Sequence, residues 1–131
     1  MSECEATVFV VDDDASVRRG LERLLRAVGH RVETFPSAHA FLSRCEREVR
    51  GCLLLDVRMP EVSGLELRET LVAMGRDIPI IFITGHGDLA MAVQAMKGGA
   101  VHFLTKPFDE PVLLDAVTEA LAQDRARRAA P

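Results

Sequence analysis

Short apolar segments recur along the chain, separated by longer segments in which apolar residues lie three or four positions apart. Four of the short segments are almost wholly apolar: residues 7–11, 51–55, 79–83 and 101–104. Their enrichment in leucine or in β-branched and aromatic residues is typical of strands buried on both faces of a sheet. Residues 31–35 alternate polar and apolar side chains, which predicts a weaker strand at the edge of that sheet.

The first three of the longer segments carry helical signals. Residues 17–28 place apolar side chains on one helical face, and Gly29 follows where a helix can end. Ser37 can cap a second, short helix. Ser63, with Glu66 three residues later, resembles a capping box and opens a third helix. This third helix is expected to turn three apolar side chains inward, which are Leu67, Leu71 and Met74.

Two further helices are predicted nearer the C-terminus. Asp88 can cap a fourth helix that ends at Gly98 and Gly99, and Asp109, with Pro111 in the first turn, opens a fifth. The order is therefore strand then helix, five times over. This alternation predicts an α/β fold, with a doubly wound, five-stranded parallel sheet, five helices on its two faces and right-handed crossovers.

Length and composition indicate a single globular domain. The chain has 131 residues, of which 48% are hydrophobic and 27% charged. We expect the domain to span residues 1–124, with residues 125–131 as a tail or the start of a linker. No apolar run is long enough to cross a bilayer, and residues 1–7 lack the pattern of a secretory signal. We therefore expect a cytoplasmic protein that does not bind membranes.

The net charge of −4 gives no basic footprint for nucleic acid, so no direct contact with DNA or RNA is expected from this chain. A short basic stretch, formed by Arg125, Arg127 and Arg128, is interpreted as a solvated helix end. The cysteines are odd in number and share no metal-ligand spacing, which favours free thiols in a reducing compartment. They are Cys4, Cys45 and Cys52.

Polar residues follow the apolar strands. The first strand ends in Asp12 and Asp13 and the third in Asp56, while Thr84 and Lys106 follow the fourth and fifth. In a parallel sheet these ends share one edge, where doubly wound sheets bind ligands. If the strand order is 2-1-3-4-5, the first and third strands are neighbours and the three carboxylates converge. Carboxylates this close repel one another unless a cation relieves them.

Such a cluster suits one hard divalent ion, Mg²⁺ or Mn²⁺, because these ions prefer oxygen ligands. Lys106 and Thr84 can bind the non-bridging oxygens of a phosphoryl group in transfer, where charge stabilisation and positioning do most of the work. Asp56 remains as the nucleophile that forms an acyl phosphate. It needs no base, because a carboxylate attacks as the anion that it already is.

Four motifs occur in register along the chain: VVDDD (10–14), LLLDVRMPEVSG (53–64), FITGHGD (82–88) and HFLTKPF (102–108). Together they strongly resemble the response-regulator receiver family, whose fold is flavodoxin-like or CheY-like. The last two motifs, with AMKGGA (95–100), are most similar to the FixJ-like group. Regulators of that group usually carry a C-terminal helix-turn-helix DNA-binding domain.

The resemblance implies a metal and phosphoacceptor role for four residues. Asp56 would accept the phosphoryl group and also bind the metal, Asp13 would bind Mg²⁺ directly, and Asp12 would act through water. The backbone carbonyl of Arg58 would supply a further ligand. Arg58 and His86 are also expected to tune the lifetime of the phosphoryl group.

The resemblance implies a switch as well. Thr84 and Lys106 match the family's switch hydroxyl and lysine, and Phe103 matches its switch aromatic. Lys106–Pro107 matches a cis peptide bond, which is uncommon even before proline. A sensor histidine kinase would phosphorylate Asp56, and the face of the fourth helix and fifth strand would then control dimerisation or a transcriptional output domain. DNA would be bound by a C-terminal domain missing from this chain.

Other functions are compatible with the same pattern. The chain could be a stand-alone receiver in a phosphorelay, or a degenerate receiver that acts only through protein contacts. An aspartate-nucleophile phosphohydrolase generally has a second Asp two residues after the nucleophile, and Arg58 stands there. A nucleotide- or flavin-binding module would need a glycine-rich loop after the first strand, where the acidic run lies. The sequence favours a phosphoacceptor that assists its own phosphorylation and dephosphorylation, not an enzyme.

Overall fold

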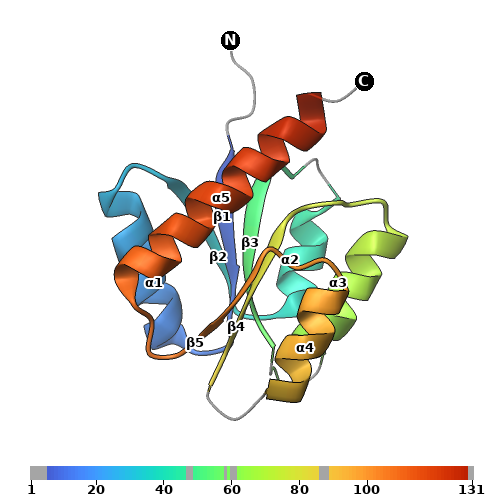
Figure 1. Cartoon of the computed structure of the whole chain (residues 1–131), viewed down its shortest axis with the longest axis horizontal. Helices are drawn as coiled ribbons and strands as arrows, with labels where there is room; N and C mark the ends of the chain where they lie inside the picture. Colours follow the sequence, from blue (N-terminus) through green and yellow to red (C-terminus); the bar gives the residue numbers. More distant parts are fainter. Residues whose placement is uncertain (1–5, 47–48, 58, 60–61, 86–88, 130–131) are drawn as a thin grey trace.

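The computed structural model describes residues 6–46, 49–57, 59, 62–85 and 89–129. Its strands form one parallel sheet in the order β2-β1-β3-β4-β5 (Figure 1). This confirms the predicted order and the edge position of the alternating strand. The strands are β1 (Thr7–Val11), β2 (Arg31–Phe35), β3 (Gly51–Asp56), β4 (Ile80–Thr84) and β5 (His102–Thr105).

Five helices in the described part of the chain cover the two faces of this sheet. They are α1 (Ala15–Ala27), α2 (Ala38–Arg44), α3 (Gly64–Ala73), α4 (Leu89–Lys97) and α5 (Glu110–Ala129). Helices α1 and α5 pack on one face, and α2 and α3 pack on the other, on the side where α4 also lies (Figure 1). The predicted doubly wound α/β architecture is confirmed.

Alternation along the strands explains the two layers of the core. Phe9, Leu53 and Leu55 pack toward α2 and α3, whereas Val10 and Leu54 pack toward α1 and α5. Successive side chains of a strand point to opposite faces, so strands covered on both sides must be apolar throughout. Every residue of β1, β3 and β4 is accordingly buried.

Helices α2 and α3 begin at their predicted caps, and the structure shows a further cap at the start of α1. Asp14 accepts hydrogen bonds from the amides of Ser16 and Val17, so α1 begins two residues before the expected position. Ser37 caps α2, and Ser63 forms a reciprocal capping box with Glu66. These side chains bind amides that would otherwise lack a partner in the first turn. The predicted cap Asp88 lies outside the described residues.

One expectation about a helix end is wrong. Met74, expected to face inward, is 41% exposed, because α3 ends at Ala73 and Met74 is the C-cap residue that follows it. Helix α5 runs from Glu110 to Ala129, so residues 125–129, expected as a tail or the start of a linker, are helical. Asp124, near this end of the helix, is buried and accepts a hydrogen bond from the Gly51 amide of β3, a contact that an apolar pattern does not reveal.

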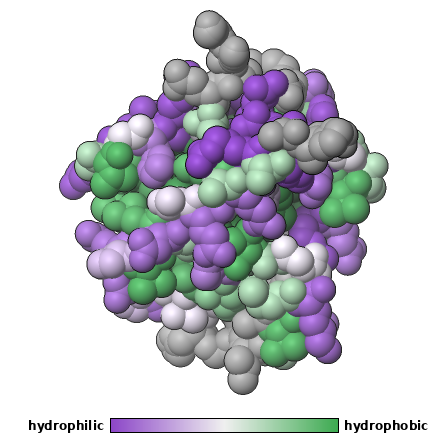
Figure 2. All heavy atoms as spheres, turned by 45° about the horizontal axis from the view of Figure 1, so that its top comes forward, coloured by the Kyte–Doolittle hydropathy of each residue, from purple (hydrophilic) through white to green (hydrophobic). Residues whose placement is uncertain are grey.

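Hydrophilic and hydrophobic residues are interspersed on the molecular face shown in Figure 2. Apolar side chains that are well exposed are spread over several helices, and they include Val28, Val72, Val93, Met96 and Val112. Among the residues that the structure describes, no helix combines the length and apolarity needed to span a bilayer.

Candidate functional site

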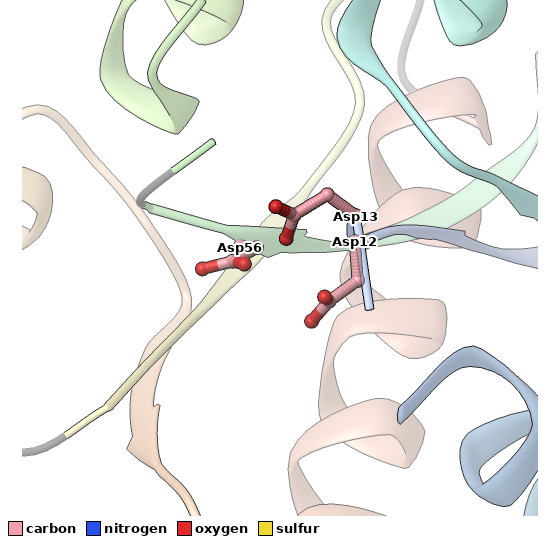
Figure 3. A group of neighbouring side chains, drawn as sticks. All are labelled: Asp12, Asp13 and Asp56. Atoms are coloured by element: carbon pink, nitrogen blue, oxygen red, sulfur yellow. The ribbon is translucent and has the colours of Figure 1, made fainter. Parts of the chain in front are cut away.

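Three carboxylates meet where β1 and β3 end. Asp12, Asp13 and Asp56 each offer an oxygen, and these oxygens lie within 4.8 Å of one another (Figure 3). Asp12 and Asp56 are buried, with 0% and 5% of their surface exposed, whereas Asp13 is exposed. The sequence therefore predicted correctly which acids converge, and the structure adds that one of them faces solvent.

Strand register produces this convergence. Val11 of β1 is paired with Leu55 of β3, so Asp12, directly after β1, and Asp56, the last residue of β3, lie at the same level. Adjacent strands lie about 4.8 Å apart, which brings the two carboxyl groups close. Gly64 at the start of α3 also approaches closely, because a Cβ there would lie 2.6 Å from the carbonyl oxygen of Asp56.

Lys106 brings a positive charge to the acids. Its Nζ lies 3.1 Å from Oδ2 of Asp12 and 3.8 Å from Oδ2 of Asp56. Burial alone would lower the pKa of Lys106, but contact with Asp12 and the charges of Asp56 and Asp14 outweigh burial and raise it. The ammonium group therefore stays charged at neutral pH. The Lys106–Pro107 peptide bond is cis, as the family resemblance implied.

Thr84 stands at the same edge, at the end of β4. Asp56 is paired with Ile83, so Thr84 lies one residue beyond the neighbour of Asp56. Its side chain is buried, and its carbonyl oxygen accepts a hydrogen bond of 2.8 Å from the Lys106 amide. Thr84 and Lys106 are thus joined through the backbone beside the carboxylates.

Phe103 lies in β5, beside Phe82 of β4, and is half-buried against the core on the α2 and α3 side. It also lines a small cavity with Pro107 and Val112. An aromatic ring in such a place has a packing role, and the switch role remains a prediction. Arg58 and His86, assigned roles by resemblance, lie outside the described residues.

The loop after β1 contains contacts that the sequence did not predict. The amide of Asp14 donates a hydrogen bond of 2.8 Å to Oδ1 of Asp12. One guanidinium nitrogen of Arg18, on α1, donates a hydrogen bond of 2.7 Å to the carbonyl oxygen of Asp12. The only sequence signal for the second contact is a basic residue one turn inside the helix that follows the acidic run. That signal is common on solvated helices.

The chemistry of this donor set fits a divalent cation. Three carboxylates face one ammonium group, which leaves an excess of negative charge at the site. Within the described part of the chain, Oδ2 of Asp12 is buried and makes its ion pair with Lys106 without a hydrogen bond of good geometry. Hard divalent ions prefer such oxygens, and Asp13 and Asp56 could hold one directly.

Comparison with known proteins identifies the family to which nearly the whole chain is similar. Residues 8–118 match the family model described as the response regulator receiver domain. The chain is 54% identical over 126 residues to Nodulation protein W of Bradyrhizobium diazoefficiens, covering 96% of this chain and 56% of that protein. It is 46% identical over 114 residues to the transcriptional regulatory protein FixJ of Rhizobium meliloti, covering 87% of this chain and 56% of FixJ.

Two solved structures of response regulators have nearly the same fold as this chain. A low-resolution structure of the response regulator StyR superposes with a TM-score of 0.87 at 55% identity, covering 95% of this chain and 63% of that one. The crystal structure of FixJ-N gives a TM-score of 0.84 at 45% identity, covering 92% of this chain and 96% of that one. The chain spans about half the length of the curated relatives it matches. With its fold, its acidic cluster and these relatives, the chain belongs to the response regulator receiver domain family of two-component systems.

Proposed function

We propose that Asp56 receives a phosphoryl group from a sensor histidine kinase and that the chain acts as a phosphoacceptor switch, not as an enzyme. The observation that carries this proposal is the meeting of Asp56 with Asp13 and Lys106 at one edge of the sheet. A lone buried aspartate would be unsuited to nucleophilic attack on a phosphoryl group. A carboxylate with a cation site and an ammonium group beside it is suited to it.

Each residue contributes a distinct step. Asp13, with Asp56 and with Asp12 through water, would hold Mg²⁺ or Mn²⁺, which supplies charge neutralisation for the phosphoryl oxygens when bound. A carboxylate oxygen of Asp56 attacks phosphorus as the nitrogen–phosphorus bond of the donor phosphohistidine breaks. The imidazole leaves with the bonding electron pair and takes up a proton. Lys106 and Thr84 bind the transferred oxygens.

The acyl phosphate adds a charge of about −1.5 to −2 beside Thr84 and Lys106 if it titrates like other phosphoryl groups. Contacts present only in the phosphorylated state shift the balance between pre-existing conformations. Thr84 moves toward the phosphoryl group and Phe103 rotates into the space it leaves. The face formed by α4 and β5 then favours a second copy of the chain or an output domain.

The names of the similar proteins support a proposal for the wider function of the chain. Several of them are transcriptional regulators or response regulator proteins of which this chain covers about half. We therefore place the chain in the cytoplasm as the receiver of a transcriptional regulator, where DNA is bound by a C-terminal domain and not by these residues. A stand-alone receiver remains the second candidate, and it would be expected to act without any DNA-binding partner domain.

Incubation with acetyl phosphate and Mg²⁺ tests the phosphoacceptor role without a kinase. Wild-type protein should gain the mass of one phosphoryl group, and borohydride reduction followed by peptide mass spectrometry should convert Asp56 to homoserine. Asp56→Asn should remain unmodified, and so should wild type in EDTA. Asp115→Asn, an exposed position on α5, serves as the matched control and should label like wild type. Labelling at another aspartate would contradict the proposal.

A further inference from the structure

The carboxylate of Asp13 is fixed differently from those of its neighbours. Asp12 is held at every polar group: its amide by Phe35, Oδ1 by Asp14, Oδ2 by Lys106 and its carbonyl by Arg18. For Asp13, by contrast, the described part of the chain supplies no hydrogen bond or ion pair to the carboxylate. Its direction is therefore set by the backbone that carries it, together with the side chain's own staggered rotamers.

That backbone includes the peptide unit between Asp12 and Asp13. The carbonyl oxygen of Asp12 belongs to this unit, and its orientation determines where the Asp13 backbone, and hence its Cα–Cβ bond, points. The 2.7 Å hydrogen bond from Arg18 is charge-assisted and short, so it holds the peptide plane firmly. Arg18 is itself anchored, because it lies in the first turns of α1 and its amide donates to the carbonyl of Asp14 at 3.1 Å.

We propose that Arg18 is a positioning residue for the metal site: by holding the Asp12 carbonyl, it aims the Asp13 carboxylate at the cation bound between Asp13 and Asp56. The inference rests on the proposed function, since it concerns the cation that this function requires. Residues that orient metal ligands typically change metal affinity by about 10- to 100-fold when removed. Arg18 would do so through the backbone, without touching the ion.

The direction in which metal affinity changes when Arg18 is removed distinguishes a positioning role from a purely electrostatic one. Arg18 is a cation near an acidic site, so its charge alone opposes binding of a second cation. Removing that charge should therefore tighten metal binding slightly. Loss of positioning should weaken it. A weaker site after removal of a nearby positive charge cannot come from the charge itself.

The test measures Mn²⁺ binding by the electron paramagnetic resonance signal of the free ion, with Mg²⁺ competition, in wild type and three variants. Arg18→Met keeps the aliphatic stem and removes the donor, and should weaken Mn²⁺ binding by about 10-fold. Arg18→Lys keeps a donor that can reach the carbonyl, and should recover part of that loss. Arg19→Met, one residue along on an exposed position, removes the same charge and should leave the affinity unchanged or slightly tighter.

Phosphorylation by acetyl phosphate provides a second readout. Arg18→Met should raise the Mg²⁺ concentration that gives half-maximal labelling, while the rate at saturating Mg²⁺ stays close to wild type. Circular dichroism checks that each variant is folded. If Arg18→Met is unfolded, the Mn²⁺ affinities of wild type and Arg18→Lys are compared instead, and Arg18→Lys should bind more weakly. Unchanged or tighter Mn²⁺ binding in Arg18→Met, or equal weakening in Arg19→Met, would overturn the inference. Wild-type labelling at Asp56 would be unaffected by that outcome, so the proposed function is judged separately.

Discussion

Cys52 lies within β3 with no exposed surface, and its environment disfavours the thiolate. Burial, followed by the nearby charge of Asp124, raises the pKa of this thiol from 9.0 to about 12. The unfolded chain therefore loses the proton near pH 9, whereas the folded chain keeps it until about pH 12. Stability contributed by this difference is present below pH 9 and is lost as pH rises through that window.

We expect wild type to lose about 1.4 kcal/mol more unfolding free energy than Cys52→Ala between pH 8 and pH 10. Urea denaturation at the two pH values measures this difference. Cys52→Ala is less stable at both, because it leaves a small cavity, but the pH-dependent part of its loss should be smaller. Equal losses in the two proteins would show that the thiol does not ionise on unfolding in this range.

Individual site residues were predictable from sequence where each stands at a strand end. Asp12, Asp56 and Thr84 each follow a buried run, and parallel pairing alone brings such positions together. Arg18 was not predictable in this way, because it acts on a backbone carbonyl. Every residue has a backbone carbonyl, whatever its side chain. A hydrogen bond to the carbonyl of Asp12 is therefore not signalled by any pair of side chains in the sequence.

At the scale of single elements, α5 shows what an apolar pattern leaves out. The stripe of buried residues on this helix includes Leu113, Val117 and Leu121, and the pattern ends there. The helix nevertheless runs on to Ala129, because Asp124 is fully buried beside the sheet and anchors the last turn. Strand limits were predicted more closely, since alternation and burial define them directly, whereas helix ends depend on such individual contacts.

Asp124 joins three parts of the structure. Its carboxylate accepts a hydrogen bond of 3.0 Å from the amide of Gly51 and forms ion pairs with Arg127 and Arg128. Arg127 in turn lies 3.9 Å from Asp77 in the segment before β4. Arg127 and Arg128 of the basic stretch therefore pair with a buried acid of their own helix, whereas Arg125 is exposed as the sequence suggested. The hydrogen bond between Gly51 and Asp124 and the pair between Arg127 and Asp77 hold α5 to the amino-terminal edge of the sheet.

Asp124→Ala should reduce the free energy of unfolding by about 3 kcal/mol, because it leaves a buried amide without a partner and two guanidinium groups without their anion. Hydrogen exchange of the amides from residue 125 to residue 128 should accelerate, as the last turn of α5 frays. Asp115→Ala removes an exposed acid from the same helix and should change stability by less than about 0.5 kcal/mol. Similar losses in the two variants would mean that the Asp124 contacts do not stabilise the fold.

At the scale of the whole molecule, the acidic site sets function against stability. Three carboxylates gathered at one edge repel one another, and Lys106 offsets only part of that repulsion. The same edge lies over a core in which β1, β3 and β4 are wholly buried, so the rest of the fold must compensate for the repulsion. A cation bound only by the folded state would relieve it and stabilise the entire domain by mass action.

Asp13→Asn should therefore have opposite effects with and without metal. In EDTA the variant should be more stable than wild type by about 1 kcal/mol, because one repelling charge is gone while the exposed side chain loses no packing. In Mg²⁺ at 100 times its dissociation constant, wild type should gain about 2.7 kcal/mol. The variant should gain much less, so the order of stability reverses. Thermal unfolding with and without Mg²⁺ measures both effects, and an order that stays the same would mean that Asp13 does not hold the cation.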